Sequence, residues 1–186
     1  MERPADCILE TERLWLCCPD PERDLCGWSE TMGDETNVRY IGGRTLDRAG
    51  SWRQMATVVG HWSICGYGFM SCILKTTGEH VGRVGPWNPL GWPEPEVGWT
   101  LHPAHHGRGY ATEAGQASIG HAFGTLGWAK VVHVIAHGNT ASAKLAERLG
   151  SRHLYDIDGI EGLPGSPPCW VYGQTRGEWE TRAPGS

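Results

Sequence analysis

The residues best suited to chemistry lie in one short segment, HPAHHGRGYATEA, at positions 102–114. It combines three histidines, which could bind a metal ion or transfer protons, with a Gly-x-Gly pair, which could let an anion approach the backbone. The segment follows a stretch typical of a strand, EVGWTL (96–101), and opens a stretch typical of a helix that ends near Leu126. The sequence thus allows a histidine site or a backbone anion site.

The strand–turn–helix context favours the anion site. The first turn of a helix leaves several backbone N–H groups without partners, and the helix dipole adds positive potential there. Gly107 and Gly109 stand where a phosphate would approach the backbone, and Arg108 adds a positive charge. The segment therefore predicts a phosphate-binding loop at the start of a helix.

Two other interpretations fit the segment less well. A dinucleotide-binding fingerprint would need a small residue at Thr112 and an acidic residue after the next strand, which ends instead in His137. A metal site would need a carboxylate or thiolate at a recognisable spacing from the histidines, and the segment has none. We expect no metal, and a histidine metal site remains the weakest hypothesis. Its members would be His102, His105 and His106.

The elements that must position this segment follow from hydrophobic periodicity and turn residues. Strands are expected at 13–18, 68–75, 80–85, 96–101, 129–136, 152–157 and 169–175. Helices are expected at 21–32, 46–62, 109–126 and 140–149, the first capped by Asp20 and the last closed by Gly150. The four prolines of 86–95 predict a loop. Hairpin-linked strands followed by a strand–helix–strand unit predict an α+β fold with a mixed sheet.

Composition limits the possible partners. The chain has 186 residues, a formal net charge of −5 and no Lys/Arg run, so we expect one domain over 1–186 and no nucleic-acid partner. No stretch approaches 18 apolar residues, and the start lacks the features of a secretory signal, so no membrane association is expected. Seven cysteines without a Cys-x-x-Cys pair indicate reduced thiols and a cytoplasmic location.

The loop residues resemble a known family. HGRGYA (106–111) is similar to the pyrophosphate loop of the GNAT superfamily, whose pattern is Gln/Arg-x-x-Gly-x-Gly/Ala, although His106 departs from the usual first residue. GRGYATEA is similar to the RimJ/RimL-type branch, which acetylates protein N-termini. Further similar segments cover nearly the whole chain: LETERLWL (9–16), RYIGG (39–43), GRVG (82–85), EVGWTL (96–101) and HGNTASAKLAERLGS (137–151).

This resemblance implies a GNAT fold and acetyl-CoA as cosubstrate. The central sheet would splay between strands 96–101 and 129–136, and the pantetheine arm would pair with backbone near Trp99 and Leu101. The pyrophosphate would bind mainly to backbone amides of His106, Gly107, Arg108, Gly109, Tyr110 and Ala111.

The resemblance also implies the catalytic residues for direct transfer to an amine. Glu96 matches a glutamate often proposed as the base, although it could equally be a solvent-exposed carboxylate at a strand end. Many members use a tyrosine as acid, but the corresponding position is Ala146, so the branch offers Ser142 instead. Asn139 would contact the pantetheine arm, and it also suits a helix N-cap; one amide can serve both roles.

The acceptor is expected to be a primary amine, either a protein N-terminus or a small molecule. Trp28, Trp87 and Trp92 could line an apolar acceptor pocket or simply pack in loops and core, and His133 is expected to be a hydrogen-bonded core residue. A homodimer is possible. The main alternative is a non-catalytic acyl-CoA-binding or sensing module that keeps the anion loop and lacks turnover.

Overall fold

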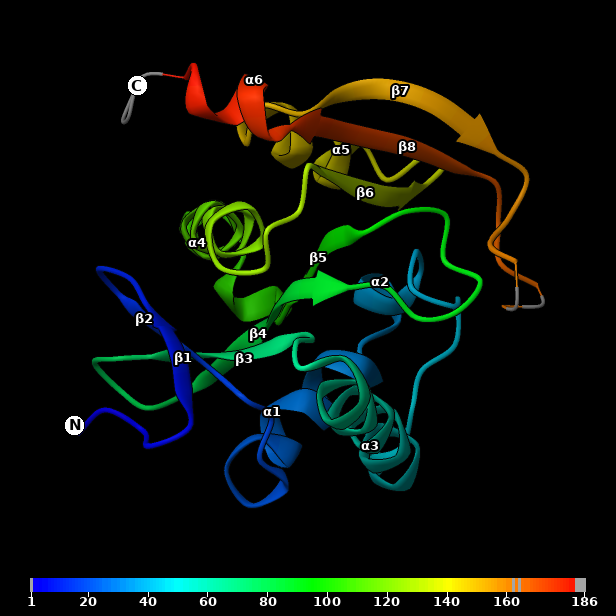
Figure 1. Cartoon of the computed structure of the whole chain (residues 1–186). Helices are drawn as coiled ribbons and strands as arrows, with labels where there is room; N and C mark the ends of the chain where they lie inside the picture. Colours follow the sequence, from blue (N-terminus) through cyan, green and yellow to red (C-terminus); the bar gives the residue numbers. More distant parts are fainter. Residues whose placement is uncertain (1, 162, 164, 183–186) are drawn as a thin grey trace.

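An eight-stranded mixed sheet organises the described part of the chain, in the spatial order β1-β2-β3-β4-β5-β6-β8-β7 (Figure 1). The computed structural model describes residues 2–161, 163 and 165–182. Neighbouring strands run antiparallel except for β5 and β6, which run parallel. The strands are β1 (Cys7–Glu10), β2 (Leu14–Cys17), β3 (Met70–Leu74), β4 (His80–Trp87), β5 (Glu96–Leu101), β6 (Lys130–Ala136), β7 (Arg152–Ile157) and β8 (Cys169–Thr175).

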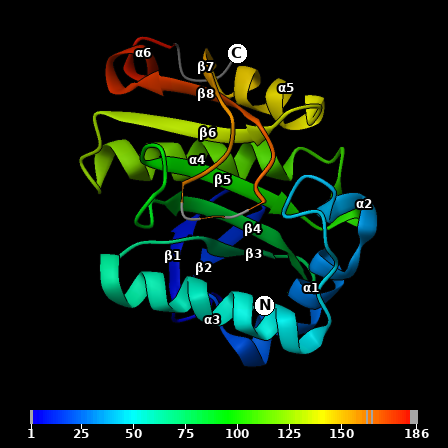
Figure 2. The same ribbon diagram turned by 90° about the vertical axis from the view of Figure 1, so that its right-hand side faces the viewer.

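Helices cover both faces of this sheet, which confirms the predicted α+β class. Helices α1 and α3 pack on one face, and α4 and α5 pack on the other (Figures 1 and 2). No helix in the described ranges is long and apolar enough to cross a bilayer. The helices are α1 (Pro21–Gly33), α2 (Glu35–Val38), α3 (Arg48–Cys65), α4 (Tyr110–Gly124), α5 (Thr140–Arg148) and α6 (Arg176–Glu180), with a 3₁₀ turn, η1, at Pro103–His105.

The parallel pair β5–β6 is where the sheet opens. The two strands share a single registered pair, Glu96 with Val132, whereas β4–β5 and β6–β8 are paired along most of their lengths. Past this pair, the N–H of Val134 donates to the Glu96 carboxylate at 3.1 Å rather than to a β5 carbonyl. A side chain thus replaces main-chain pairing, and the predicted splay between these strands is present.

Local signals explain several helix boundaries. Asp20 accepts hydrogen bonds from the N–H groups of Glu22 and Arg23, and Pro21 begins α1, as predicted. Asn139 caps α5 by accepting from the Ser142 N–H at 3.2 Å. Gly150 follows α5 with a φ of +94°, a conformation that favours glycine, and it closes the helix as predicted.

Other boundaries differ from the sequence predictions for identifiable reasons. β1, α2 and α6 were not predicted: each has only four or five residues, and unlike the equally short β2 (LWLC) each contains charged residues that interrupt the apolar pattern. β4 continues to Trp87, inside the predicted loop. β4 pairs with β3 only as far as Val84, whereas its pairing with β5 includes Pro86. Pro86 therefore has no neighbouring strand on the β3 side, where its missing N–H leaves no sheet hydrogen bond unmade. α3 runs from Arg48 to Cys65 rather than from 46 to 62, and α4 ends at Gly124.

Candidate active site

A cleft of about 690 Å³ lies where β5 and β6 separate. Its walls come from β5, β6, the turn before α4, the first turns of α4 and α5, and the region of α2. All the predicted site residues except Arg108 line it: Glu96, Trp99, Leu101, His106, Gly107, Gly109, Tyr110, Ala111, Asn139 and Ser142. The structure thus gathers into one cavity residues that are spread over 47 positions of sequence, from 96 to 142.

The start of α4 is open to this cleft. Gly107 and Gly109 adopt left-handed φ values of +73° and +81°, which a side chain would strain. Each of the other α-helices in the described ranges has a side-chain cap, whereas Gly109, the N-cap of α4, supplies none. The first-turn N–H groups of α4 have no intrahelical partner, so they are available to an anion in the cleft.

A half-buried carboxylate contacts this loop from the opposite side. Glu113, in the first turn of α4, accepts hydrogen bonds from the Thr11 hydroxyl at 2.6 Å and from Arg13 N and Nε at 2.7 and 2.6 Å. Arg13 Nη1 donates to the carbonyl of Arg108 at 2.9 Å, and its guanidinium lies 4.6 Å from the centre of the Tyr110 ring. Burial opposes ionisation of Glu113, but the hydrogen bonds from Thr11 and Arg13 lower its pKa overall. This brace was not predicted, since its members lie 100 positions apart.

Glu96 occupies the point where the strands part. Only 6 % of its surface is exposed, so it is not a solvated carboxylate at a strand end. Its Oε1 accepts from Val134 N at 3.1 Å, and its Oε2 accepts from Trp92 Nε1 at 2.6 Å. Burial raises the pKa of Glu96 to about 7, although both hydrogen bonds and the charge of Arg83 oppose this shift. A carboxyl group with this pKa can take up a proton near neutral pH.

Ser142 lies on the α5 side of the cleft. Its hydroxyl oxygen accepts a hydrogen bond from Trp99 Nε1 at 3.3 Å, which leaves the hydroxyl hydrogen free to donate. Asn139 uses its side-chain oxygen to cap α5, and its NH2 group retains donor capacity. Both residues line the same cavity as Glu96.

Two of the three histidines in the 102–106 segment form hydrogen bonds with the backbone. His106 bonds through Nε2 to the carbonyl of Leu101 at 3.0 Å, and His102 Nδ1 accepts from the Ala104 N–H at 3.2 Å. In the described ranges, no group of three or more His, Cys, Asp or Glu residues is arranged to hold a metal ion. His133 is a buried core residue, as predicted: its ring nitrogens bond to Val97 O at 2.6 Å and to Ser151 Oγ at 2.9 Å. Burial lowers the pKa of His133 to about 4, so the ring is neutral at physiological pH.

The tryptophans considered for an acceptor pocket, Trp28, Trp87 and Trp92, have different surroundings, and none of them lines the cleft. Trp87 stacks on Phe69 with ring centres 5.0 Å apart, and Trp28 is 1 % exposed within the core beneath the sheet. Packing therefore explains these two. Trp92 instead donates its N–H to Glu96, a contact that its position in a Pro-rich loop did not indicate.

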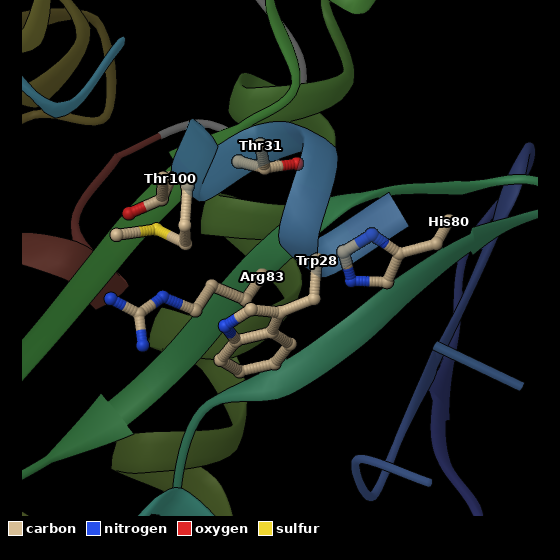
Figure 3. Close-up of a pocket in the computed structure, with 6 residues that line it drawn as sticks. Trp28, Thr31, His80, Arg83 and Thr100 are labelled. Atoms are coloured by element: carbon tan, nitrogen blue, oxygen red, sulfur yellow. The ribbon is translucent and has the colours of Figure 1, made fainter. Parts of the chain in front are cut away.

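Sequence reasoning missed several residues near the acceptor end. Residues of the α2 region line the cleft, namely Thr36, Asn37, Tyr40 and Ile41. Arg83 on β4 lies buried in a small pocket with Trp28 and Thr100 (Figure 3). Its position within GRVG could have been noticed, since a charged residue in a central strand is unusual.

An uncapped helix start, a parted pair of strands and a buried carboxyl group thus lie together in one cleft. The sequence of residues 13–152 matches the family model described as acetyltransferase (GNAT) domain. The chain is 34 % identical over 157 residues to the uncharacterized protein YkkB of Bacillus subtilis (strain 168), covering 80 % of this chain and 87 % of that protein.

Solved structures agree with this match. The acetyltransferase from Agrobacterium tumefaciens str. C58 is similar with a TM-score of 0.75 at 30 % identity, over 90 % of this chain and 94 % of that one. The aminoglycoside acetyltransferase AAC(6')-Ib in complex with coenzyme A shares the fold, with a TM-score of 0.70 at 20 % identity over 92 % and 99 % of the two chains. The chain belongs to the GNAT acetyltransferase family, whose members use acetyl-CoA.

Proposed function

We propose that this protein transfers the acetyl group of acetyl-CoA directly to a primary amine, with Glu96 as the base and Ser142 as the acid. The observation that carries the proposal is the placement of Glu96, buried and with its pKa raised to about 7, in the same cleft as the open start of α4. A non-catalytic acyl-CoA sensor would need only the hydrogen bonds that Glu96 accepts from Val134 and Trp92, and not a pKa near neutrality.

The cofactor half of the cleft suits the parts of acetyl-CoA. Backbone N–H groups of residues 106–111 would hold the pyrophosphate, while unpaired backbone of β5 near Trp99 and Leu101 would bind the pantetheine arm as an added strand. Asn139 would donate from its NH2 group to the same arm. Acetyl-CoA supplies the activated acetyl group when bound.

The chemistry of this chain's residues is then proton transfer. Glu96 accepts a proton from the amine as its nitrogen bonds to the carbonyl carbon, directly or through water. The carbon–sulfur bond breaks, and Ser142 donates its hydroxyl proton to the leaving sulfur and regains one from solvent. The products are an amide and the free thiol of coenzyme A.

We propose two classes of acceptor. GRGYATEA supports a RimJ/RimL-type enzyme that acts on protein N-termini, and the second class of acceptor is a small-molecule amine. We further propose that residues 1–186 act as one domain in the cytoplasm, where the seven cysteines, all free thiols in the structure, would stay reduced. A homodimer is compatible with these proposals, and sedimentation would detect it.

The proposed function predicts ligand-dependent stability and thiol release. Acetyl-CoA should raise the melting temperature, because it binds the folded state alone, and thiol should appear only when a suitable amine is added. Ser142→Ala should lower kcat roughly tenfold, somewhat below the usual contribution of general acid catalysis, without weakening acetyl-CoA binding. Ser63→Ala, a change at an exposed position of α3, is the matched control.

Each result bears on a different part of the proposal. If millimolar acetyl-CoA causes no thermal shift, both the transferase hypothesis and the sensor hypothesis are rejected. A thermal shift without thiol release from a broad panel of amines and peptides would reject the transferase and favour the sensor. Unchanged kcat in Ser142→Ala would reject Ser142 as the acid.

A further inference from the structure

Arg83 is a buried cation without a hydrogen-bond partner among the residues the structure describes. It is 9 % exposed, and none of its guanidinium nitrogens forms a hydrogen bond or ion pair with a described residue. The Nε atom is buried and unpaired. Burying an unpaired charge costs free energy, so this residue calls for a partner of opposite charge.

Aromatic rings hold the side chain but leave its donors unused. The guanidinium carbon lies 4.7 Å from the centre of the Phe69 ring and 5.1 Å from that of Trp28. Figure 3 shows the guanidinium extending away from His80, on the side of Thr100. Ring faces stabilise a cation without using its N–H groups. The fork of donors is therefore fixed in position and available.

The same face of the sheet carries Arg83 and Glu96. Arg83 is paired with Thr100 across β4 and β5, and Glu96 lies four residues before Thr100, so their side chains point to one side. Between them stands Gly98, where a Cβ would come 3.0 Å from the Phe69 ring and 3.2 Å from Glu96 Oε1. Thr100 lines both the Arg83 pocket and the large cleft. Thr100 therefore lies between the small pocket that holds the guanidinium and the large cleft, on the same face of β5 as Glu96.

We propose that Arg83 binds the carboxylate of the acceptor, and that the substrate is a primary amine which also carries a carboxylate. This inference rests on the proposed function, since it places the amine at Glu96. A guanidinium fork matches a carboxylate with two parallel hydrogen bonds. Among the described residues, no second permanent cation lines the Arg83 pocket; the other titratable residue there is His80, whose pKa burial lowers to about 4. A single cation suits a singly charged carboxylate better than a phosphate.

Arg83 could instead act only on Glu96, since its charge works to lower the pKa of that carboxyl group. Burial lowers the pKa of Arg83 itself to about 10, which leaves it charged at neutral pH. A residue with that role alone would affect every acceptor equally and would shift the pH profile. A carboxylate-binding residue would affect only acceptors that carry the carboxylate.

The test compares amines that differ only in the carboxylate. One arm uses ω-amino acids from β-alanine to 6-aminohexanoate beside alkylamines of the same length. The other uses C-terminally amidated Gly-Asp beside amidated Gly-Asn, which distinguishes a peptide source from a free amino acid. Arg83→Met keeps the apolar stem without charge, Arg83→Lys keeps the charge without the fork, and Arg53→Met, at an exposed position of α3, is the control.

We expect wild-type enzyme to favour the carboxylated member of at least one pair. Arg83→Met should raise its KM by about tenfold or more, with a smaller rise for Arg83→Lys and none for Arg53→Met, while KM for the matched alkylamine stays within about twofold. Melting temperature and its shift by acetyl-CoA report whether each variant is folded. No preference for carboxylated amines, or an equal loss for both members with a shifted pH profile, overturns the proposal.

Calorimetric titration of the same amines into the protein–CoA complex separates this inference from the proposed function. Arg83-dependent binding of the carboxylated amines without thiol release supports the anion site and rejects the transfer reaction. Thiol release from plain amines that is indifferent to Arg83→Met supports the reaction and rejects the anion site.

Discussion

In the proposed function, the two halves of the cleft recognise their ligands by different means. The cofactor half, formed by the 106–111 loop, β5 and the start of α5, offers main-chain groups and the conformations that two glycines allow. The proposed acceptor half would depend on a few side chains, above all the buried Glu96 and Arg83 and the half-buried Trp92, which donates to Glu96. Main-chain recognition tolerates many side-chain changes, whereas recognition by a buried charge is lost or altered by one substitution. Members of one family can therefore share a cofactor and differ in acceptor.

The largest expected effect tests the acceptor half at Glu96. Glu96→Gln preserves the size of the side chain but removes the base, so kcat should fall by about 10²–10⁴-fold while acetyl-CoA affinity is unchanged. Stopped-time thiol assays and calorimetry measure the two quantities. Glu147→Gln, at an exposed position of α5, is the matched control.

The pH profile provides a second readout for Glu96. Because the deprotonated carboxylate is the base and its pKa is about 7, kcat/KM should rise with pH through that value in wild-type protein. Two other ionisable groups interact electrostatically with this carboxyl group, Arg83 and Cys169. Burial lowers the pKa of Arg83 to about 10 and raises the pKa of Cys169, so neither group titrates near pH 7. If kcat/KM of Glu96→Gln still rises with pH through about 7, the base is another group.

An intermediate effect is expected in the cofactor half at Gly109. Gly109→Ala places a side chain at a φ of +81°, with its Cβ 3.3 Å from Arg13 Nη2. The strain of about 1–3 kcal/mol should weaken acetyl-CoA binding by roughly tenfold, with kcat little changed. Gly60→Ala, in α3 where a Cβ meets nothing within 4 Å, is the control.

The contrast between main chain and side chain is sharpest within the loop itself. Arg108→Ala removes a charge but leaves the backbone amides in place, so acetyl-CoA affinity should change less than in Gly109→Ala. A larger loss in Arg108→Ala would show that side-chain charge, rather than the main chain, dominates this half.

The smallest effect is expected at the brace behind the loop. Glu113→Gln keeps one acceptor oxygen for Thr11 and Arg13 but removes the charge that pairs with the Arg13 guanidinium at 2.6 Å. We expect KM for acetyl-CoA to rise by about threefold, without a change in kcat, because the pair is partly exposed and solvent weakens it. A fall in kcat with unchanged KM would place Glu113 in the reaction rather than behind the cofactor loop.

The cofactor half could be predicted from sequence because its signals are local. Gly107 and Gly109, the helix that follows them and the cap at Asn139 are visible within short windows. The burial of Glu96 could not be predicted in this way, because it depends on Trp92 folding back from a loop and on β6 arriving from 38 residues away.

The acceptor half as a whole shows the limit of local patterns. Arg83 stands in HVGRVGPW, a strand whose apolar residues do not alternate, so the pattern marks the charge as unusual but does not tell which face it lies on or what buries it. Only the packing of α1 over that face, which brings Trp28 and Met32 to the pocket around Arg83, buries it. The α+β class and the splayed sheet followed from the order of elements and the family resemblance, but this burial is a tertiary event.

The missing cap of α4 has a consequence for the whole molecule. Five other helices in the described ranges carry their caps in the sequence, and α4 leaves its first amides to whatever anion enters the cleft. In the proposed function, acetyl-CoA supplies the hydrogen-bond acceptors that this helix start lacks. A protein built in this way is least resistant to unfolding, and so to proteolysis, when the supply of its acetyl donor runs low.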